Sequence, residues 1–162
     1  MSDISVTAPE ASRDLSIEDI TVFKLARLVS INERAGQGWS ESRFGLGLNA
    51  WRVLALVQSK GPLRAGDLAD LMLIDRSQLS RLLKQLCARG LVDSSPDPSD
   101  ARAVVLRATL EGRVLHDRVM EHVVAGNERM LAPLSPEEAR QFDEMLTRLT
   151  AHGLRTLCQS RA

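Results

Sequence analysis

The sequence predicts a mainly α-helical fold that carries one small β-hairpin. Only 3% of the 162 residues are aromatic, none is Tyr, and 44% are hydrophobic, so the core must consist mostly of Leu, Val, Ala and Met. Such a composition favours packed helices, and long segments near both ends repeat apolar residues at helical spacing. One turn rich in Pro, Asp and Ser, residues 96–102, lies between two short β-prone runs and predicts the hairpin.

The N-terminal part is expected to begin as a tail and continue as a helix. Residues 1–13 are polar and without periodicity, which is typical of a disordered tail. Ser16, with Asp19 three residues later, predicts the start of a helix that runs to about Arg34. This helix has more apolar residues than one buried stripe requires, so we expect a partner subunit to cover part of it.

The next segment is rich in glycine and serine. Residues 36–47 therefore predict a loop or a broken helix. Trp39 and Phe44 within it are expected either to pack under the next element or to line a ligand pocket. Asn49 is then placed to cap a helix over residues 50–58.

Two short helices are expected next, separated by a turn. The first spans Ala65–Met72, with Leu68 and Leu71 facing the core. Asp75 is a good N-cap for the second, and Gln78 can complete a capping box. Gly90 should end this second helix. Together the two segments predict a helix-turn-helix.

The second helix has a cationic face opposite its leucines. Between Arg76 and Arg89 there are four basic residues and no acidic one, although the formal net charge of the chain is +0. A major groove offers base acceptors to Arg and Lys and mixed edges to Gln and Ser. A solvated surface helix is the simpler alternative. The candidate major-groove residues are Ser77, Gln78, Ser80, Arg81, Lys84 and Gln85.

The hairpin that follows completes a winged helix-turn-helix. Its tip is expected to lie along a DNA backbone or to insert Arg102 into a minor groove, where negative potential is concentrated. Asp100 is expected to hold the Arg102 guanidinium in a fork-like salt bridge, although an incidental turn salt bridge is the alternative. Arg64 and Arg76, near the starts of the two helices, are expected to contact phosphates.

Two long helices should close the chain. Thr109 predicts the cap of a helix of about twenty residues, roughly 30 Å long. Ser135 and Glu138 form a capping box with Pro136 at the first helical position, so a last apolar helix begins there. Terminal helices that are far apart in sequence and rich in apolar residues suit an intersubunit bundle.

With these elements in place, the chain resembles the multiple-antibiotic-resistance regulator (MarR) family of bacterial transcription factors. The most specific part of the resemblance is the Asp-x-Arg pattern in the hairpin, and the match covers roughly residues 20–155. The matching segments are Asn49–Leu54, Leu68-Ala69, Asp75–Arg81, Arg89–Val92, Asp97–Ala103 and Leu106–Gly112.

The resemblance implies an obligate homodimer that binds a pseudo-palindromic operator and commonly represses transcription. It also implies that a small molecule, often aromatic or anionic, releases the DNA by binding between the dimerisation and DNA-binding regions. Two departures stand out, because many relatives have basic residues where this chain has Ala101 and Ser94. This wing is therefore expected to grip DNA less strongly than a typical one.

The predicted organisation has four parts and no catalytic site. They are a disordered tail (1–13), an N-terminal dimerisation helix and loop (14–48), a winged helix-turn-helix domain (49–109) and C-terminal dimerisation helices (110–162). There is no glycine-rich phosphate loop, no paired-cysteine metal motif and no nucleophile with an evident base, so we expect neither an enzyme nor a metal or cofactor. The expected partners are double-stranded DNA, a second copy of the chain and a small-molecule effector. No membrane segment or signal peptide is recognised, so a cytoplasmic protein is expected.

Two other functions remain open at this stage. A redox-sensing repressor would use Cys87 or Cys158 as a thiol switch, although a small, partly buried helix residue is the simpler interpretation of Cys87. A winged-helix protein-interaction module would bind no DNA, but its surface would more often present aromatic or Met anchors than a cationic helix.

Overall fold

The computed structural model describes residues 15–160, and the expected tail over residues 1–13 lies outside them. Helices dominate, and the one sheet described has three strands in the order β1-β3-β2, which confirms the predicted fold class. The elements are η1 (Ile17–Asp19), α1 (Thr21–Phe44), α2 (Leu48–Lys60), β1 (Leu63–Arg64), α3 (Ala65–Met72), α4 (Arg76–Ala88), β2 (Val92–Asp97), β3 (Asp100–Ala108), α5 (Leu110–Leu131) and α6 (Pro136–Gln159).

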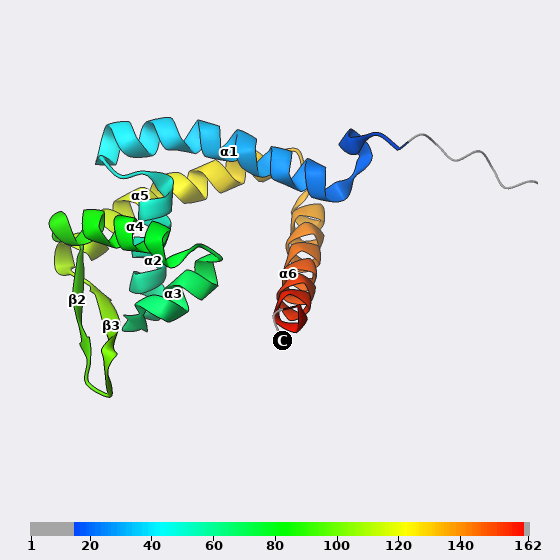
Figure 1. Ribbon diagram of the computed structural model, residues 1–162. Coiled ribbons are helices and arrows are strands. Elements are labelled where there is room, and N and C mark those ends of the chain that lie inside the picture. The colour runs from blue at the N-terminus through cyan, green and yellow to red at the C-terminus, as the bar shows by residue number, and fades with distance from the viewer. Residues whose placement is uncertain (1–14, 161–162) are drawn as a thin grey trace, which may run out of the picture.

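The α2–β3 elements form one group, α1 and α5 cross beside it, and α6 stands apart from the group (Figure 1). The buried core lies mainly within this group and reaches α5 through Val119. Its fully buried members include Leu54 of α2, Leu68 of α3, Leu86 of α4 and Leu106 of β3. The core therefore fixes the helix-turn-helix and the base of the hairpin as one unit.

The first long helix differs from the expectation at both ends. Ser16 and Asp19 do form a capping box, but they cap only the short 3₁₀ helix η1, and α1 begins at Thr21. The loop or broken helix expected over residues 36–47 is wrong for residues 36–44, because α1 continues to Phe44 and ends at Gly45, whose φ is 59°. A glycine inside a helix costs only about 1 kcal/mol relative to Ala. Here the absence of a side chain is useful, since a Cβ on Gly36 would lie 2.8 Å from Leu48 Cδ1.

The second helix starts earlier than predicted. Gly47 is its N-cap and makes no side-chain cap hydrogen bond, so the expected cap at Asn49 is wrong. Asn49 lies one residue inside the helix, and its Oδ1 accepts a hydrogen bond from Arg52 Nη1 at 2.9 Å. Trp51 and Leu54 of this helix are buried in the core.

The helix-turn-helix has the predicted bounds, with one difference in its packing. Leu68 and Ala69 of α3 are buried against the core, together with Leu79 and Leu86 of α4. Leu71 was expected to face inward but is 50% exposed, because α3 packs on the side that carries Leu68 and Ala69. The turn between the helices includes Leu73 in the left-handed region, at φ 53°.

The hairpin is longer than its sequence suggested, and it gains a third strand. Most of the expected turn, residues 96–102, belongs to the strands, and Asp97 pairs with Asp100 across the tip. The two-residue strand β1 pairs with β3, with Leu63 opposite Leu106 and Arg64 opposite Val105. A strand of two residues has no periodicity, so β1 could not be predicted from the sequence.

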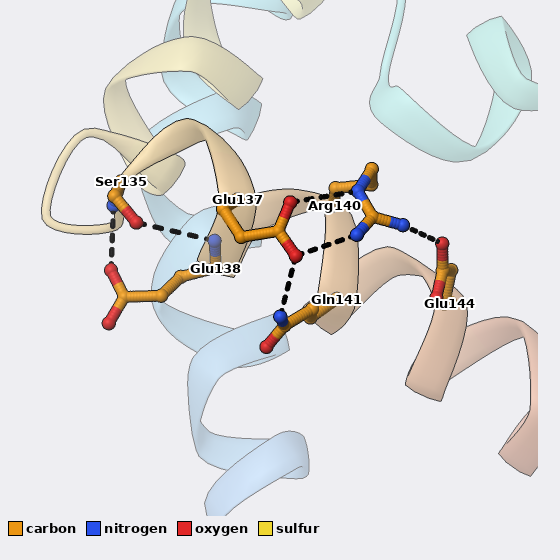
Figure 2. Close-up of polar contacts among 6 residues, drawn as sticks. All are labelled: Ser135, Glu137, Glu138, Arg140, Gln141 and Glu144. Carbon is orange, nitrogen blue, oxygen red and sulfur yellow. Dashed lines mark hydrogen bonds and ion pairs between the residues drawn. The ribbon is translucent and has the colours of Figure 1, made fainter.

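The two C-terminal helices begin at the predicted caps. The Thr109 hydroxyl accepts a hydrogen bond from the Gly112 N–H at 3.0 Å. Ser135 and Glu138 form the capping box of α6 (Figure 2). Figure 2 also shows Arg140 between the carboxylates of Glu137 and Glu144 on the same helix. Within residues 15–160, no helix has the length and hydropathy that crossing a bilayer would require.

Candidate nucleic-acid interface

The polar face of α4 is open to solvent, as its periodicity predicted. Ser77, Ser80, Arg81 and Lys84 are exposed, while Leu79 and Leu86 on the other side are buried. Arg76 and Gln85 are also exposed, and Gln78 is half-buried. The surface therefore presents cationic and hydrogen-bonding side chains on a helix of the width that a major groove accepts.

The start of α4 is held by Asp75, although not by a full capping box. Asp75 Oδ1 accepts hydrogen bonds from the Gln78 backbone N–H at 2.7 Å and from the Ser77 hydroxyl at 2.6 Å. These two bonds lower the pKa of Asp75 and keep it charged. The side chain of Gln78 makes no return bond to the cap, so that part of the prediction is wrong and Gln78 keeps its amide for other contacts.

Arg89, at the other end of α4, has a role that the sequence did not reveal. Its Nη1 donates to Gly45 O at 2.6 Å and its Nη2 to Phe44 O at 3.0 Å. Arg89 thus binds the free carbonyl groups at the C-terminus of α1, where a positive charge is favoured. This contact ties the C-terminal end of α4 to α1.

The wing presents Arg102 on β3, and its side chain is exposed. The expected fork-like salt bridge between Asp100 and the Arg102 guanidinium is not formed in the described structure. Instead, Asp100 Oδ1 accepts the Arg102 backbone N–H at 3.0 Å, as a short carboxylate does in a tight turn. Asp100 therefore shapes the turn, and the Arg102 guanidinium is left for a contact outside the chain.

The ion pair at the wing is formed by Arg64 and Asp97 instead of Arg102 and Asp100. Its Nε donates to Asp97 Oδ2 at 2.7 Å, and its Nη2 donates to Ser99 Oγ at 3.1 Å. The side chain remains 46% exposed. Arg64 of β1 and Arg102 of β3 thus lie on the same three-stranded sheet. The Arg64 guanidinium is bound to the turn of the hairpin, whereas Arg102 bonds to the turn through its backbone N–H.

If Arg81 contacts a base, Arg81→Ala should weaken specific DNA binding by about 1–3 kcal/mol and relax specificity at that base pair. The reason is that a side chain fixed on a rigid helix loses directional hydrogen bonds when it is removed. Binding isotherms against a duplex library would measure both effects. Arg140→Ala removes the same charge from α6, away from α4, and serves as the control. Equal affinities for wild type and Arg81→Ala would remove Arg81 from the interface.

A second candidate site is a cleft of about 660 Å³ between the winged-helix group and the long helices. Its volume lies within the range of small-molecule sites. Trp39 lines it, and Phe44 packs beside Trp39 with its ring edge-on at a centroid distance of 6.1 Å. Both expectations for the segment thus apply, because Phe44 packs against the core and Trp39 also faces the cleft. The lining residues include Leu25, Val29, Asn32, Glu33, Trp39, Leu48, Trp51, Arg52, His122, Asn127, Arg129, Phe142 and Leu146.

The cleft has an apolar wall with a few polar groups. Arg52 Nη1 lies 2.9 Å from Glu33 Oε1, and both side chains are partly exposed. Trp51 is 8% exposed, and its indole nitrogen is a buried donor with no hydrogen-bond partner among residues 15–160. An unsatisfied buried donor of this kind costs about 1–3 kcal/mol. Apart from Trp39, the lining residues could not be predicted from the sequence, because the walls come from α1, α2, α5 and α6.

His122 packs against the aromatic residues at the end of α1. The His122 ring stacks on Trp39 at 5.4 Å, and its Nε2 lies 2.9 Å from Arg43 Nη1. Because Arg can only donate, His122 accepts at Nε2 and donates from Nδ1 to Arg118 O at 3.2 Å. Within residues 15–160, no group of three or more His, Cys, Asp or Glu side chains is arranged to hold a metal ion. Cys87 is half-buried and Cys158 is exposed.

Comparisons with known proteins agree on one family. The sequence pattern of the MarR family matches residues 44–103. The HTH-type transcriptional regulator YxaD of Bacillus subtilis is 32% identical over 68% of this chain and 78% of its own length. The repressor IacR of Pseudomonas putida is 25% identical over 91% of this chain and 87% of its own length. The crystal structure of the Streptomyces coelicolor regulator PcaV with its natural ligand has a TM-score of 0.71 and 25% identity, covering 86% of this chain and 98% of that one. A winged helix-turn-helix with a solvent-facing cationic helix, found in a chain with these relatives, identifies the protein as a member of the MarR family of DNA-binding transcriptional regulators.

Proposed function

We propose that the protein is a homodimeric repressor that binds a pseudo-palindromic operator and is released from it by a small anionic ligand. As a regulator of bacterial type it would act on DNA in the cytoplasm. The observation that carries the proposal is an apolar surface on α1 and α6 that a single chain leaves uncovered.

This surface has the composition of an interface. No residue of α6 is buried within the chain, although its apolar residues recur on one face. Monomeric proteins rarely leave so large an apolar area exposed. The exposed apolar residues on α1 are Val22, Leu28, Val29 and Ile31, and those on α6 are Met145, Leu149 and Leu154.

A symmetric pair of chains would present two α4 helices to one side of a DNA duplex. Helix-turn-helix dimers of this kind bind half-sites about 34 Å apart, which is one turn of B-DNA. We assign major-groove contacts to the exposed face of α4 and a minor-groove or backbone contact to Arg102. The name of the relative IacR as a repressor supports negative control. The proposed major-groove residues are Ser77, Gln78, Ser80, Arg81, Lys84 and Gln85, with a phosphate contact from Arg76.

The cleft supports a ligand response. Trp39 and Phe142 offer apolar walls, and Arg52, which is paired with Glu33 at 2.9 Å, offers a cation that a ligand carboxylate can compete for. These groups suit a small aromatic carboxylate, and the structure of the related regulator PcaV was solved in complex with its natural ligand. Arg52 lies on α2, which packs against α4 in the shared core, so binding at the cleft can reach the DNA-binding surface.

The proposal is tested by capturing DNA from fragmented genomic DNA of the source organism and footprinting the captured site. We expect protection of two inverted half-sites by a dimer, and release when a panel of benzoate-type carboxylates is added. Arg52→Ala should keep DNA binding and lose the release, while Arg140→Ala should behave as wild type. Protection of a single half-site by a monomer would contradict the dimer, and release that is equal in Arg52→Ala would contradict the role of the cleft.

A further inference from the structure

Arg64, Asp97 and Ser99 form a closed hydrogen-bonded cluster that joins the start of α3 to the tip of the wing. Arg64 Nε donates to Asp97 Oδ2 at 2.7 Å, and Arg64 Nη2 donates to Ser99 Oγ at 3.1 Å. The Ser99 hydroxyl and backbone N–H both donate to Asp97 Oδ1 at 2.7 Å. Each of the three residues therefore contacts the other two, and the two contacts of Arg64 join positions that are 33 and 35 residues apart in the chain.

Asp97 is the centre of this cluster. Its side chain is only 9% exposed, although it lies on a hairpin that projects from the core. The hydrogen bonds from Ser99, followed by the contact with Arg64, lower the pKa of Asp97 from 3.8 to about 2. A carboxyl with a depressed pKa contributes stability above its unfolded value, and this contribution is lost as the pH falls through about 2. The Asp97 carboxylate and the Arg64 guanidinium are therefore both charged at every physiological pH.

The position of Arg64 allows the cluster to connect the wing to the helix-turn-helix. Arg64 is the N-cap residue of α3, where its donor-only guanidinium cannot accept the free N–H groups of the helix, and this side chain donates to the wing. Its backbone pairs with Val105 of β3, while its guanidinium reaches the turn beyond the end of β2. The hairpin is thus attached to the helix-turn-helix at two levels, once through the backbone of β1 and once through this side chain.

We propose that Arg64, Asp97 and Ser99 position the wing, and that Arg64 acts on DNA through Arg102 rather than by binding a phosphate itself. Without the cluster, the outer part of the hairpin would be held only by its own ladder, and an isolated two-stranded ribbon is marginally stable in water. A fixed tip holds Arg102 at one distance and angle from α4, so that both elements can contact DNA at the same time. This inference rests on the proposed role of Arg102 at the wing.

The alternative is that Arg64 leaves Asp97 and neutralises a phosphate when DNA binds. The two cases differ in the effect of Asp97→Asn, which keeps the shape of the side chain and removes its charge. If Arg64 binds phosphate, this change frees Arg64 and removes a negative charge near the DNA, so affinity rises or stays the same. If Arg64 positions the wing, the change loosens the tip and affinity falls.

The experiment measures operator affinity by fluorescence anisotropy for Asp97→Asn, Arg102→Ala and the double variant, as a function of salt. We expect Asp97→Asn to weaken operator binding about tenfold. Arg102→Ala should have a smaller effect in the Asp97→Asn protein than in wild type, because substitutions at residues that act through one another do not have additive effects on affinity. Arg102→Ala alone should reduce the salt slope by about one unit. Asp93→Asn removes a charge from an exposed residue at the base of the same strand and should not weaken binding.

Hydrogen exchange of the DNA-free protein provides a readout that does not depend on operator binding. Asp97→Asn and Ser99→Ala should speed amide exchange in residues 95–105 and leave α2 and α4 unchanged, whereas Ser99→Thr, which keeps the hydroxyl, should restore slow exchange. Unchanged exchange would overturn the cluster as a support of the wing. Faster exchange with undiminished affinity, or additive effects with Arg102→Ala, would overturn its role in DNA binding. A wild-type protein that is monomeric, or that no ligand releases from DNA, would contradict the proposed function and leave the cluster as a support of the wing, because hydrogen exchange is measured on the DNA-free chain.

Discussion

Replacing Leu149 by Glu should separate the proposed dimer and reduce operator affinity by about 100-fold or more. Leu149 lies on the apolar face of α6 and is 56% exposed in the single chain. A carboxylate at this position would be buried without a partner in an apolar interface, which is strongly unfavourable. A dimer that contacts two half-sites binds DNA about 10²–10⁴ times more tightly than a subunit that contacts one, and this gain in affinity is lost when the subunits separate. Sedimentation equilibrium and operator titration measure the two effects.

Ala151→Glu is the matched control for this prediction. Ala151 is two positions further along α6, so it lies about 200° around the helix from Leu149 and outside the apolar face. It is exposed in the chain and receives the same charge. We expect this variant to remain dimeric with near wild-type affinity. A dimeric Leu149→Glu protein would show that α6 is not the interface, and two equally impaired variants would indicate that α6 merely tolerates no added charge.

Features that depend on neighbouring residues could be predicted from the sequence. The caps at Asp75, Thr109 and Ser135 each involve residues no more than three positions away, so the pattern contains all the information they need. The exposed face of α4 follows in the same way from the spacing of its leucines. For this reason the sequence predicts the bounds and the exposed face of α4, while the DNA contacts of that face stay a prediction.

Features that depend on distant residues could not be predicted. The glycines in α1 indicated a break, but the helix continues to Phe44, and Gly36 lies where Leu48 of α2 packs closely against it. Arg89 was counted among the cationic residues of α4, yet it binds carbonyl groups more than forty positions away. Arg64 was assigned to a phosphate, yet the pairing of β1 brings it to Asp97. In each case the partner was recognisable only from tertiary packing.

The cleft depends even more on residues that are distant in the sequence. Its lining residues come from four helices, α1, α2, α5 and α6, so no single segment carries a recognisable motif. The ion pair between Arg52 and Glu33 joins α1 to α2, and the buried Trp51 N–H is visible only when its surroundings are known. A surface made from one helix can therefore be predicted from periodicity, whereas a cavity between helices requires the fold.

Gly112→Ala should strongly destabilise the protein, because this glycine lies where α5 meets the end of α4. A Cβ at this position would lie 2.0 Å from the carbonyl oxygen of Leu91 and 3.2 Å from Leu54 Cδ1. The first of these is a backbone atom that also accepts a hydrogen bond from Thr109 N, so it cannot move without breaking the junction. Overpacking of this kind costs about 1–3 kcal/mol, and more where backbone must shift. Urea unfolding followed by circular dichroism measures the loss.

Gly38→Ala separates this steric effect from the general effect of removing a helical glycine. A Cβ at Gly38 of α1 would meet nothing within 4 Å, so only the conformational gain remains. That gain is about 0.8–1 kcal/mol in a helix interior, and it also acts at Gly112, where it partly offsets the clash. The two substitutions should therefore change the free energy of unfolding in opposite directions. A Gly112→Ala protein as stable as wild type would mean that α5 can move away from Leu91, and the junction between the winged helix and the long helices would then be less rigid than its close contacts imply.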